Sequence, residues 1–577
     1  MVTDTLQERG RGGGRALGLS VPPVLALLAV LAVLPTLLSL RLTLPVGPFY
    51  WDLFIYFDGA NRVFDGQMPA ADFFAPGGPL GYWLFAGTLA LFPEGQPLLI
   101  AQWCLLAVTA PLMALVLLDV DKRSRTLAFA LLVPFLVFSL LPVNVEEYYF
   151  YPGIDGFGIY NRHTSQLLYV LASALVFVER RRRLLPLIAG AMLALFLIKI
   201  TGFVAGGLLC ALAFCAGRVD LRGALAVAGA FALGLGLLQA TTGVVLPYLA
   251  DIAALVSMNT GSLLPRFVQA SSIHFRVVGP LVVLGLALLW LDGRAMLRRL
   301  SSLRPAGAFA TLRDLADCDV VWLGATAFAA LFFETQNTGG QGFIFVWPVL
   351  LRILVRANRF KGTAFVSVIA LVAASSLPTV VQITQRAARA LVGQVNYVAL
   401  PHQHLKTLGS VSQRSEVVER ARKMMTAYSG FPETWRYFSA QEMLPSFTLY
   451  TEPDFQLTWL MAADEAAGAI LAYEARHGVR FETIMNINFV NPFPYLLDRH
   501  GTRLVAIGAD PFRAVPDPDA AVLAAVADTD LVLYPKCPVT NANDKLLSLY
   551  QPALTDHQPI ALSRCWDAFV RPGLAAR

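Results

Sequence analysis

A series of long apolar segments without charged side chains is the feature that most constrains the fold of this 577-residue chain. Residues 21–40 and 97–118 are two such segments. About 20 apolar residues in a helix suffice to cross roughly 30 Å of hydrocarbon. Only 15% of the residues are charged and the mean hydropathy is +0.59, whereas soluble domains carry about 25% charged residues. The sequence therefore predicts a polytopic α-helical membrane protein.

Basic residues gather in the connections between the apolar segments and predict their orientation. The clusters lie at 9–15, 122–125, 180–183, 218–222, 294–313 and 356–361. Cytoplasmic loops are enriched in Lys and Arg, so placing every cluster inside gives eleven crossings, with the N-terminus inside and the C-terminus outside. The crossings are expected near 21–43, 97–119, 126–142, 164–179, 184–200, 201–217, 224–248, 276–292, 318–334, 341–357 and 363–382. This topology accounts for the net charge of +6 without a nucleic-acid partner.

The remaining segments predict external loops and a C-terminal domain. A short apolar piece, 79–93, is left over from the crossings and is placed along the outer membrane surface. From residue 384 the chain becomes polar, and its patterns alternate between helix and strand. Helices are expected at 462–476, 518–527 and 543–551, and strands at 503–507 and 530–534. We therefore expect a transmembrane domain at 1–383 and an extracytoplasmic α/β domain at 384–577.

The first external loop carries acidic and aromatic side chains at helical spacing. It contains "FYWDLFIYFDGANRVFDGQMPAADFFAPGGPLGYW", residues 49–83. Asp52 and Tyr56 are four residues apart and share one face of a helix predicted over 52–65. Asp58 lies on another face, where a surface ion pair with Arg62 is expected. Asp52 has two interpretations. Its carboxylate caps the helix N-terminus, or it is a functional residue of an active site.

The pattern around Asp52 resembles the first external loop of the GT-C glycosyltransferases. The matching residues are Asp-x-x-x-Tyr-x-x-x-Ala from Asp52, Gly66 six residues later, and then "PGGPLGYWLFA". These membrane enzymes use polyprenyl-phosphate sugars and include bacterial mannosyl-, galacturonosyl- and aminoarabinosyl-transferases. The resemblance covers most of residues 20–380. It implies that the loop 44–96 forms two helices on the membrane, the second at 79–93, and that Asp52 is the catalytic base.

Further stretches at outer helix ends extend the resemblance. In "AGAMLALFLIKITGF", Lys199 matches a lysine that meets the lipid phosphate in the family; the alternative is a lysine that reaches from a helix end to the interface. In "IYNRHTSQLL", Arg162 is the second expected phosphate ligand. Other polar residues near these helix ends suit a sugar or acceptor. They are Tyr56, Glu146, Glu147, His163, Glu334, Gln336 and Asn337.

The resemblance implies an inverting glycosyltransferase. Such an enzyme moves a sugar from a polyprenyl-phosphate donor to a glycan, lipid or protein acceptor. Asp52 would take the proton of the acceptor hydroxyl, and Lys199 and Arg162 would hold the departing phosphate. The outer face would be the periplasmic side of a bacterial inner membrane. No cofactor is expected. Some branches carry a metal-binding Asp-x-Asp or Asp-x-Glu in the second loop. Here that loop offers Glu146, Glu147 and Asp155 instead, so a divalent metal is an alternative that the sequence does not support.

Two other classes of function are compatible with parts of the sequence. An O-antigen polymerase or ligase would place its dense arginine-rich loop late in the chain, whereas the dense loop here is the first. A transporter or flippase for lipid-linked sugars would show ionisable residues in mid-membrane and symmetric halves. A sensor or scaffold with a partner-binding outer domain is a further alternative.

The C-terminal domain contains two cysteines that are candidates for a disulfide. Cys537 follows an expected strand, and Cys565 lies in "ALSRCWDAFVRP", an expected terminal strand. An oxidising compartment permits the bridge; the alternative is two free thiols. Because no catalytic constellation is visible after residue 384, this domain is expected to bind the acceptor or to act as a lid.

Overall fold

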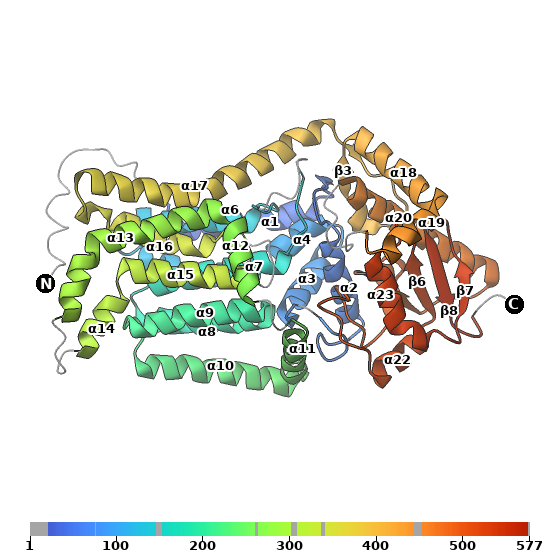
Figure 1. Ribbon diagram of the computed structural model, residues 1–577, viewed down its shortest axis with the longest axis horizontal. Coiled ribbons are helices and arrows are strands. Elements are labelled where there is room, and N and C mark those ends of the chain that lie inside the picture. Colours follow the sequence, from blue (N-terminus) through green and yellow to red (C-terminus); the bar gives the residue numbers. More distant parts are fainter. Residues whose placement is uncertain are drawn as a thin grey trace.

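The computed structural model describes residues 21–75, 77–145, 153–259, 263–301, 308–335, 341–443 and 453–574. Helices lie side by side in a bundle, and a mixed α/β domain caps one end of it (Figure 1). The first loop, drawn in blue, lies between the bundle and that domain. The expected architecture, a helical membrane protein with a C-terminal α/β domain, is confirmed.

Each of the eleven predicted crossings coincides with described helices. At 97–119 a pair of helices occupies the segment, α4 (Pro97–Trp103) and α5 (Leu106–Val120). By length and apolar composition alone, four of the described helical segments could cross a membrane, or five if a bent pair at 310–334 is one span. The number of crossings therefore stays a prediction. The other bundle helices are α1 (Pro23–Ser39), α6 (Arg125–Leu140), α7 (Ile159–Phe177), α8 (Arg181–Ile198), α9 (Ile200–Cys215), α10 (Leu221–Thr242), α13 (Phe275–Ser301), α15 (Asp319–Glu334), α16 (Trp347–Val355) and α17 (Gly362–Gly393).

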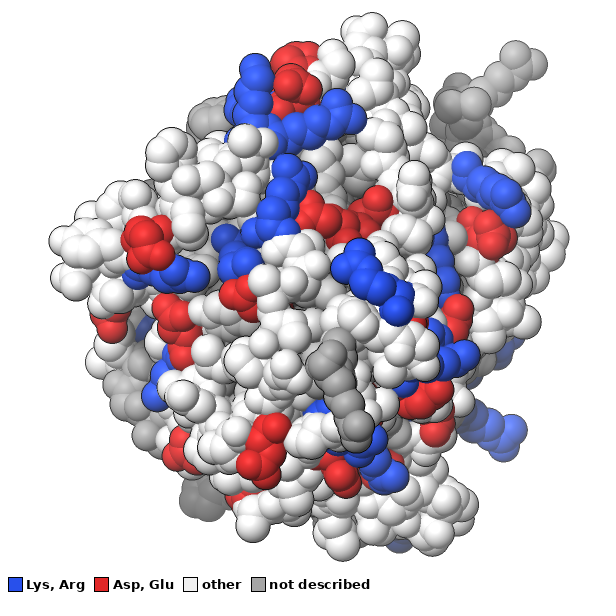
Figure 2. Space-filling model, turned by 90° about the vertical axis from the view of Figure 1, so that its right-hand side faces the viewer, with Lys and Arg blue, Asp and Glu red and all other residues white. Residues whose placement is uncertain are grey.

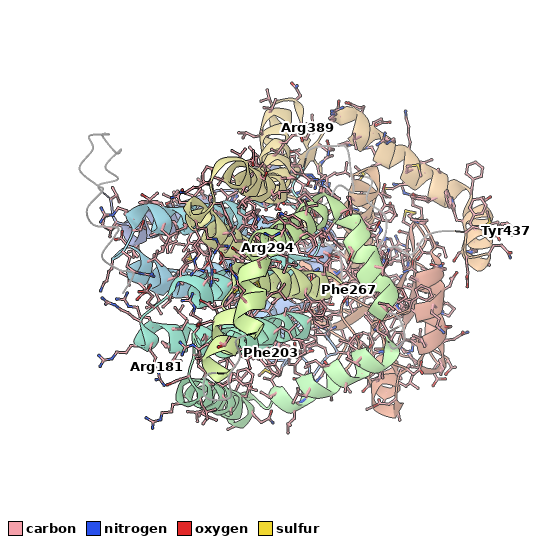
Figure 3. The ribbon with its side chains drawn as sticks, turned by 60° about the vertical axis from the view of Figure 1, so that its left-hand side comes forward. Arg181, Phe203, Phe267, Arg294, Arg389 and Tyr437 are labelled. Atoms are coloured by element: carbon pink, nitrogen blue, oxygen red, sulfur yellow. A yellow bond between two sulfur atoms is a disulfide. The ribbon has the colours of Figure 1, made fainter. Side chains whose placement is uncertain are left out.

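The predicted basic clusters at 122–125, 180–183, 218–222 and 356–361 lie at the end of the bundle opposite the C-terminal domain, whereas the cluster at 9–15 lies outside the described residues. Arg183, at the start of α8, lies 3.6 Å from the Asp119 carboxylate of α5. Arg352 of α16 pairs with Asp319 of α15 at 2.8 Å. Figure 3 shows Arg181 at this basic end and Tyr437 at the far side of the C-terminal domain. We call the other end of the bundle the domain end. Three shorter helices complete the membrane part: α11 (Val245–Met258), α12 (Leu263–Ile273) and α14 (Ala308–Ala316).

The C-terminal domain is built on a five-stranded sheet within the described residues. Its strand order is β5-β4-β6-β8-β7, with β4 parallel to β5 and β6, and β8 antiparallel to β6 and β7. Acidic and basic side chains are interspersed over its outer face (Figure 2), as suits a surface in water. The strands are β4 (Thr483–Asn486), β5 (His500–Gly501), β6 (Leu531–Pro535), β7 (Gln558–Ala561) and β8 (Trp566–Val570), and the helices are α18 (Ser415–Gly430), α19 (Pro432–Ala440), α20 (Pro453–His477), α21 (Phe493–Leu497), α22 (Ala520–Ala527) and α23 (Asn541–Tyr550).

The strand predicted at 503–507 does not join this sheet. Residues 503–504 form a turn, in which Leu504 has φ of +66°, and the following residues pair with the first loop: the Phe74 N–H donates to the Val505 carbonyl at 3.2 Å and the Ile507 N–H to the Phe74 carbonyl at 2.9 Å. A second small sheet makes a similar connection. In it β1 (Leu44–Pro45) of the first loop runs parallel to β3 (Val411–Gln413), which pairs with β2 (Val398–Ala399).

The first loop contains the two helices that the sequence predicts, α2 (Asp52–Phe64) and α3 (Pro79–Leu91). The predicted Asp58–Arg62 ion pair is present at 2.7 Å, but its expected surface position is wrong. The C-terminal domain covers it, so that the Arg62 side chain is 1% exposed. Arg62 Nη1 donates to the Thr502 carbonyl at 2.6 Å and to Gln67 Oε1 at 3.1 Å. The pair thus joins α2 to the C-terminal domain.

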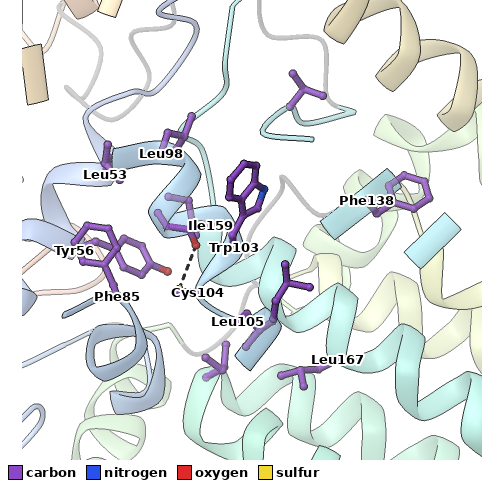
Figure 4. Packing of buried hydrophobic residues seen from close by; sticks show 14 of the residues in the cluster. Leu53, Tyr56, Phe85, Leu98, Trp103, Cys104, Leu105, Phe138, Ile159 and Leu167 are labelled. Atoms are coloured by element: carbon purple, nitrogen blue, oxygen red, sulfur yellow. Dashed lines mark hydrogen bonds between the residues drawn. The ribbon is translucent and has the colours of Figure 1, made fainter. Parts of the chain in front are cut away.

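Apolar side chains form one continuous core from the bundle through the first loop into the C-terminal domain. Figure 4 shows Tyr56 and Phe85 of the first loop beside Leu98 and Trp103 of α4. At the domain boundary, the Trp51 ring packs 5.0 Å from Trp459 and 5.4 Å from Phe455, both in α20. This packing holds the start of α2 in place, and Asp52 is its first residue.

Candidate active site

The Asp52 carboxylate points from α2 toward the second loop. Trp51 occupies the N-cap position of α2, and Asp52 Oδ2 accepts a hydrogen bond of 3.1 Å from the Gly158 N–H. Gly158 precedes α7 and has φ of +59°, a left-handed conformation that favours glycine. The contact therefore joins the first loop to the start of α7.

Burial raises the pKa of Asp52 to about 7. The residue is only 8% exposed, and desolvation disfavours the charged carboxylate. The Gly158 hydrogen bond lowers the pKa, the Asp155 carboxylate raises it, and the positive charges of Arg513 and Arg162 lower it. A carboxylate that titrates near neutral pH is suited to accept a proton from a hydroxyl group.

Arg162 is fully buried next to this carboxylate. Its Nη2 donates to the carbonyls of Asp155 and, at 3.3 Å, Phe157. Its Nε and Nη1 have no hydrogen-bond partner among the described residues. Burial raises the pKa of Asp155, while Arg162 lowers it, and the Phe157 N–H donates to Asp155 Oδ1 at 2.8 Å. Buried donors without acceptors are costly, so Arg162 has capacity for an anion.

Lys199 forms the one-residue connection between α8 and α9 at the domain end. Its Nζ donates to Asn161 Oδ1 and lies 4.8 Å from the centre of the Phe333 ring. The residue is 8% exposed, and Glu334 at the end of α15 acts on it electrostatically. Within the part of the chain that the structure describes, no carboxylate forms an ion pair with this ammonium. A buried cation without a counter-ion favours an incoming anion.

The two cationic side chains are linked through α7. Asn161 holds Lys199, and the next residue, Arg162, holds the second loop near Asp52. Asp52, Arg162 and Lys199 are therefore connected through the start of α7 at the domain end, and their roles as base and anion-binding groups stay predictions.

Comparison with known proteins finds no matching family model and no matching curated protein. Among solved structures, the chain is similar to ArnT from Cupriavidus metallidurans in the apo state, with 15% identity over 96% of this chain and 99% of that one, and a TM-score of 0.36. It is also similar to the oligosaccharyltransferase AglB from Archaeoglobus fulgidus in complex with an inhibitory peptide and a dolichol-phosphate, with 11% identity over 93% and 72% and a TM-score of 0.36. The apo form of the A. fulgidus enzyme matches at 12% identity with a TM-score of 0.38.

Of the other predicted site residues, three are described by the structure and four are not. The Tyr56 ring packs 5.5 Å from the Phe85 ring, on the same helix as Asp52. Glu334 Oε2 lies 3.7 Å from His274 Nε2 and acts electrostatically on Lys199. His163 is buried on the bundle side, where its Nε2 lies 2.8 Å from the Ala101 carbonyl. The four that lie outside the described residues are Glu146, Glu147, Gln336 and Asn337.

The sequence does not predict three neighbours of the candidate site. They are Asn161, which binds Lys199, and Asp155 and Arg513, which act electrostatically on Asp52. Asn161 adjoins a predicted residue, and in the sequence Asp155 stands out only as a carboxylate of the second loop. In the described ranges there is no group of three His, Cys, Asp or Glu side chains that could hold a metal ion. In the C-terminal domain, Cys537 and Cys565 form a disulfide with a Cα–Cα distance of 5.1 Å.

Proposed function

We propose that this protein is an inverting GT-C-type glycosyltransferase that moves a sugar from a polyprenyl-phosphate donor to an acceptor hydroxyl. The observation that carries the proposal is the placement of two buried ionisable side chains at the start of α7, where Asp52 accepts a hydrogen bond from the Gly158 N–H and Lys199 donates one to Asn161. Both belong to a membrane protein, which suits a donor whose tail stays in lipid. The outer face of a bacterial inner membrane is the proposed location.

The reaction is a single displacement at the anomeric carbon. The acceptor oxygen forms the new bond to this carbon while its proton passes to the Asp52 carboxylate. The bond from the carbon to the phosphate oxygen breaks, and its electron pair leaves with the polyprenyl phosphate. Lys199 and the unpartnered nitrogens of Arg162 stabilise the departing charge. Attack opposite the leaving group inverts the anomeric configuration.

The acceptor is proposed to be a glycan or lipid of the cell envelope. The C-terminal domain, residues 384–577, contributes to its site because it covers the first loop and supplies Arg513. No observation favours the polymerase, ligase or transporter alternatives over this proposal.

The test is transfer from a panel of polyprenyl-phosphate sugars by purified protein, followed through release of polyprenyl phosphate. Asp52→Asn should lower the rate by about 100- to 10,000-fold. Asp251→Asn is the matched control, because Asp251 on α11 is 9% exposed and also accepts a backbone hydrogen bond, from Ala75. Its pKa is likewise raised to about 7 by burial. Equal losses in both variants would contradict the assignment of Asp52.

A further inference from the structure

A turn of the C-terminal domain, residues 509–514, is held against the membrane part on two sides. On one side the Ala509 N–H donates to the Phe489 carbonyl at 2.9 Å. The Phe489 ring lies 6.3 Å from the ring of Trp51, which directly precedes Asp52. On the other side Asn259, at the end of α11, donates from Nδ2 to the Arg513 carbonyl at 2.9 Å. The backbone of Arg513 is thus fixed between the first loop and α11.

The Arg513 side chain is oriented by one ion pair. Its Nε donates to Asp510 Oδ2 at 2.6 Å, and Asp510 Oδ1 accepts from the Phe512 N–H at 3.1 Å. Asp510 is itself buried, whereas the Arg513 side chain is 51% exposed. Across the described ranges, Nη1 and Nη2 of Arg513 have no hydrogen-bond partner. These two nitrogens form a planar fork that matches the two oxygens of a carboxylate or phosphate.

We propose that Arg513 binds an anionic group, a carboxylate or a phosphate ester, on the acceptor substrate and thereby selects acidic acceptors. This inference rests on the proposed function, in which Asp52 must touch the acceptor hydroxyl. The positive charge of Arg513 acts electrostatically on the Asp52 carboxylate. Lys199, by contrast, is bonded to Asn161 within the bundle, where the lipid donor is expected. Arg513 comes from the domain that faces water, which is the side from which a polar acceptor arrives.

Binding of small glycosides tests this proposal without requiring transfer. Methyl glucuronide carries a carboxylate and methyl glucoside does not. Arg436→Ala is the matched control, because Arg436 also pairs with an acid three residues away, Glu433, and is 52% exposed on the same domain. Arg513→Ala should weaken methyl glucuronide binding on the order of 10- to 100-fold. The affinity of Arg513→Ala for methyl glucoside should not change, and Arg436→Ala should bind methyl glucuronide as wild type does. Wild-type protein that binds both glycosides equally would overturn the proposal.

Polyprenyl phosphate distinguishes the two possible sources of the anion. Wild type and Arg513→Ala should bind polyprenyl phosphate with the same affinity. If Arg513→Ala binds polyprenyl phosphate more weakly while its methyl glucuronide binding is unchanged, Arg513 belongs to the donor site and the proposed acceptor role is overturned. In transfer assays, Arg513→Ala should raise KM for an acidic acceptor and shift the rate profile to higher pH, because the charge that lowers the pKa of Asp52 is gone. If the wild-type protein binds methyl glucuronide through Arg513 but transfers no sugar, the proposed glycosyltransferase function is refuted, whereas the proposed anion site at Arg513 is confirmed.

Discussion

Replacing Asp58 with asparagine should loosen the contact between α2 and the C-terminal domain. The Arg62 guanidinium is 1% exposed, and Asp58 is its ion-pair partner at 2.7 Å. Its other described hydrogen-bond acceptors are the neutral oxygens of Thr502 and Gln67, and the Phe73 ring lies 5.2 Å from its guanidinium carbon. The substitution therefore leaves a buried positive charge with neutral acceptors only.

The magnitude follows from the burial of both partners. Removing one member of a buried ion pair costs about 3–5 kcal/mol. An asparagine oxygen can still accept from Arg62 Nε, so we expect the lower bound, about 3 kcal/mol. Because 1.4 kcal/mol is a factor of ten, opening of this contact should become about 100-fold more frequent. The amides that report it belong to residues 58–67 and 499–507.

Hydrogen exchange followed by mass spectrometry measures this opening in detergent-solubilised protein. Glu433→Gln is the control, since its pair with Arg436 is exposed and such pairs contribute about 0–1 kcal/mol. Combining Asp58→Leu with Arg62→Met should restore protection, because apolar residues can replace a buried pair. Unchanged exchange in Asp58→Asn, or an equal increase in Glu433→Gln, would refute the reasoning.

Three further predictions concern the site and the topology. Because burial raises the pKa of Asp52 to about 7 and the base must be ionised, kcat/KM should increase about tenfold per pH unit below 7 and level off above it; a flat profile from about pH 5 to 8 would contradict this. Lys199→Ala should weaken polyprenyl phosphate binding by about tenfold or more, with partial recovery in Lys199→Arg; an unchanged affinity would count against the lysine. With the exposed Cys215 replaced by serine, a cysteine at Gly430 should react with an impermeant maleimide in intact spheroplasts, and one at Lys122 only after permeabilisation. The opposite labelling would overturn the orientation.

Local patterns in the sequence predict the helices and the position of Asp52. Apolar runs bounded by basic residues mark the bundle, and the four-residue spacing of Asp52 and Tyr56 marks the start of α2. These features depend on neighbours within a few residues. The boundary at 384 is less clear, because α17 continues to Gly393 with no local signal that ends it sooner.

Contacts between distant segments could not be predicted in the same way. Asp58 and Arg62 read as a surface pair because nothing nearby indicates that Thr502 covers them. The segment 503–507 has the pattern of a strand, but pairing with Phe74 rather than with a sheet depends on how two domains pack. Arg513 lies over 400 residues from Asp52 in the sequence, so only the folded chain reveals that its charge acts on the Asp52 carboxylate.

The most direct test of the central claim is a single-turnover reaction that compares wild type with Asp52→Asn. A labelled polyprenyl-phosphate sugar is bound to each protein first, so that donor binding is measured separately from transfer. The account predicts equal donor binding, transfer by wild type alone, and a product whose anomeric configuration, read by NMR, is opposite to that of the donor. Retention of configuration, or transfer by Asp52→Asn at the wild-type rate, would contradict it.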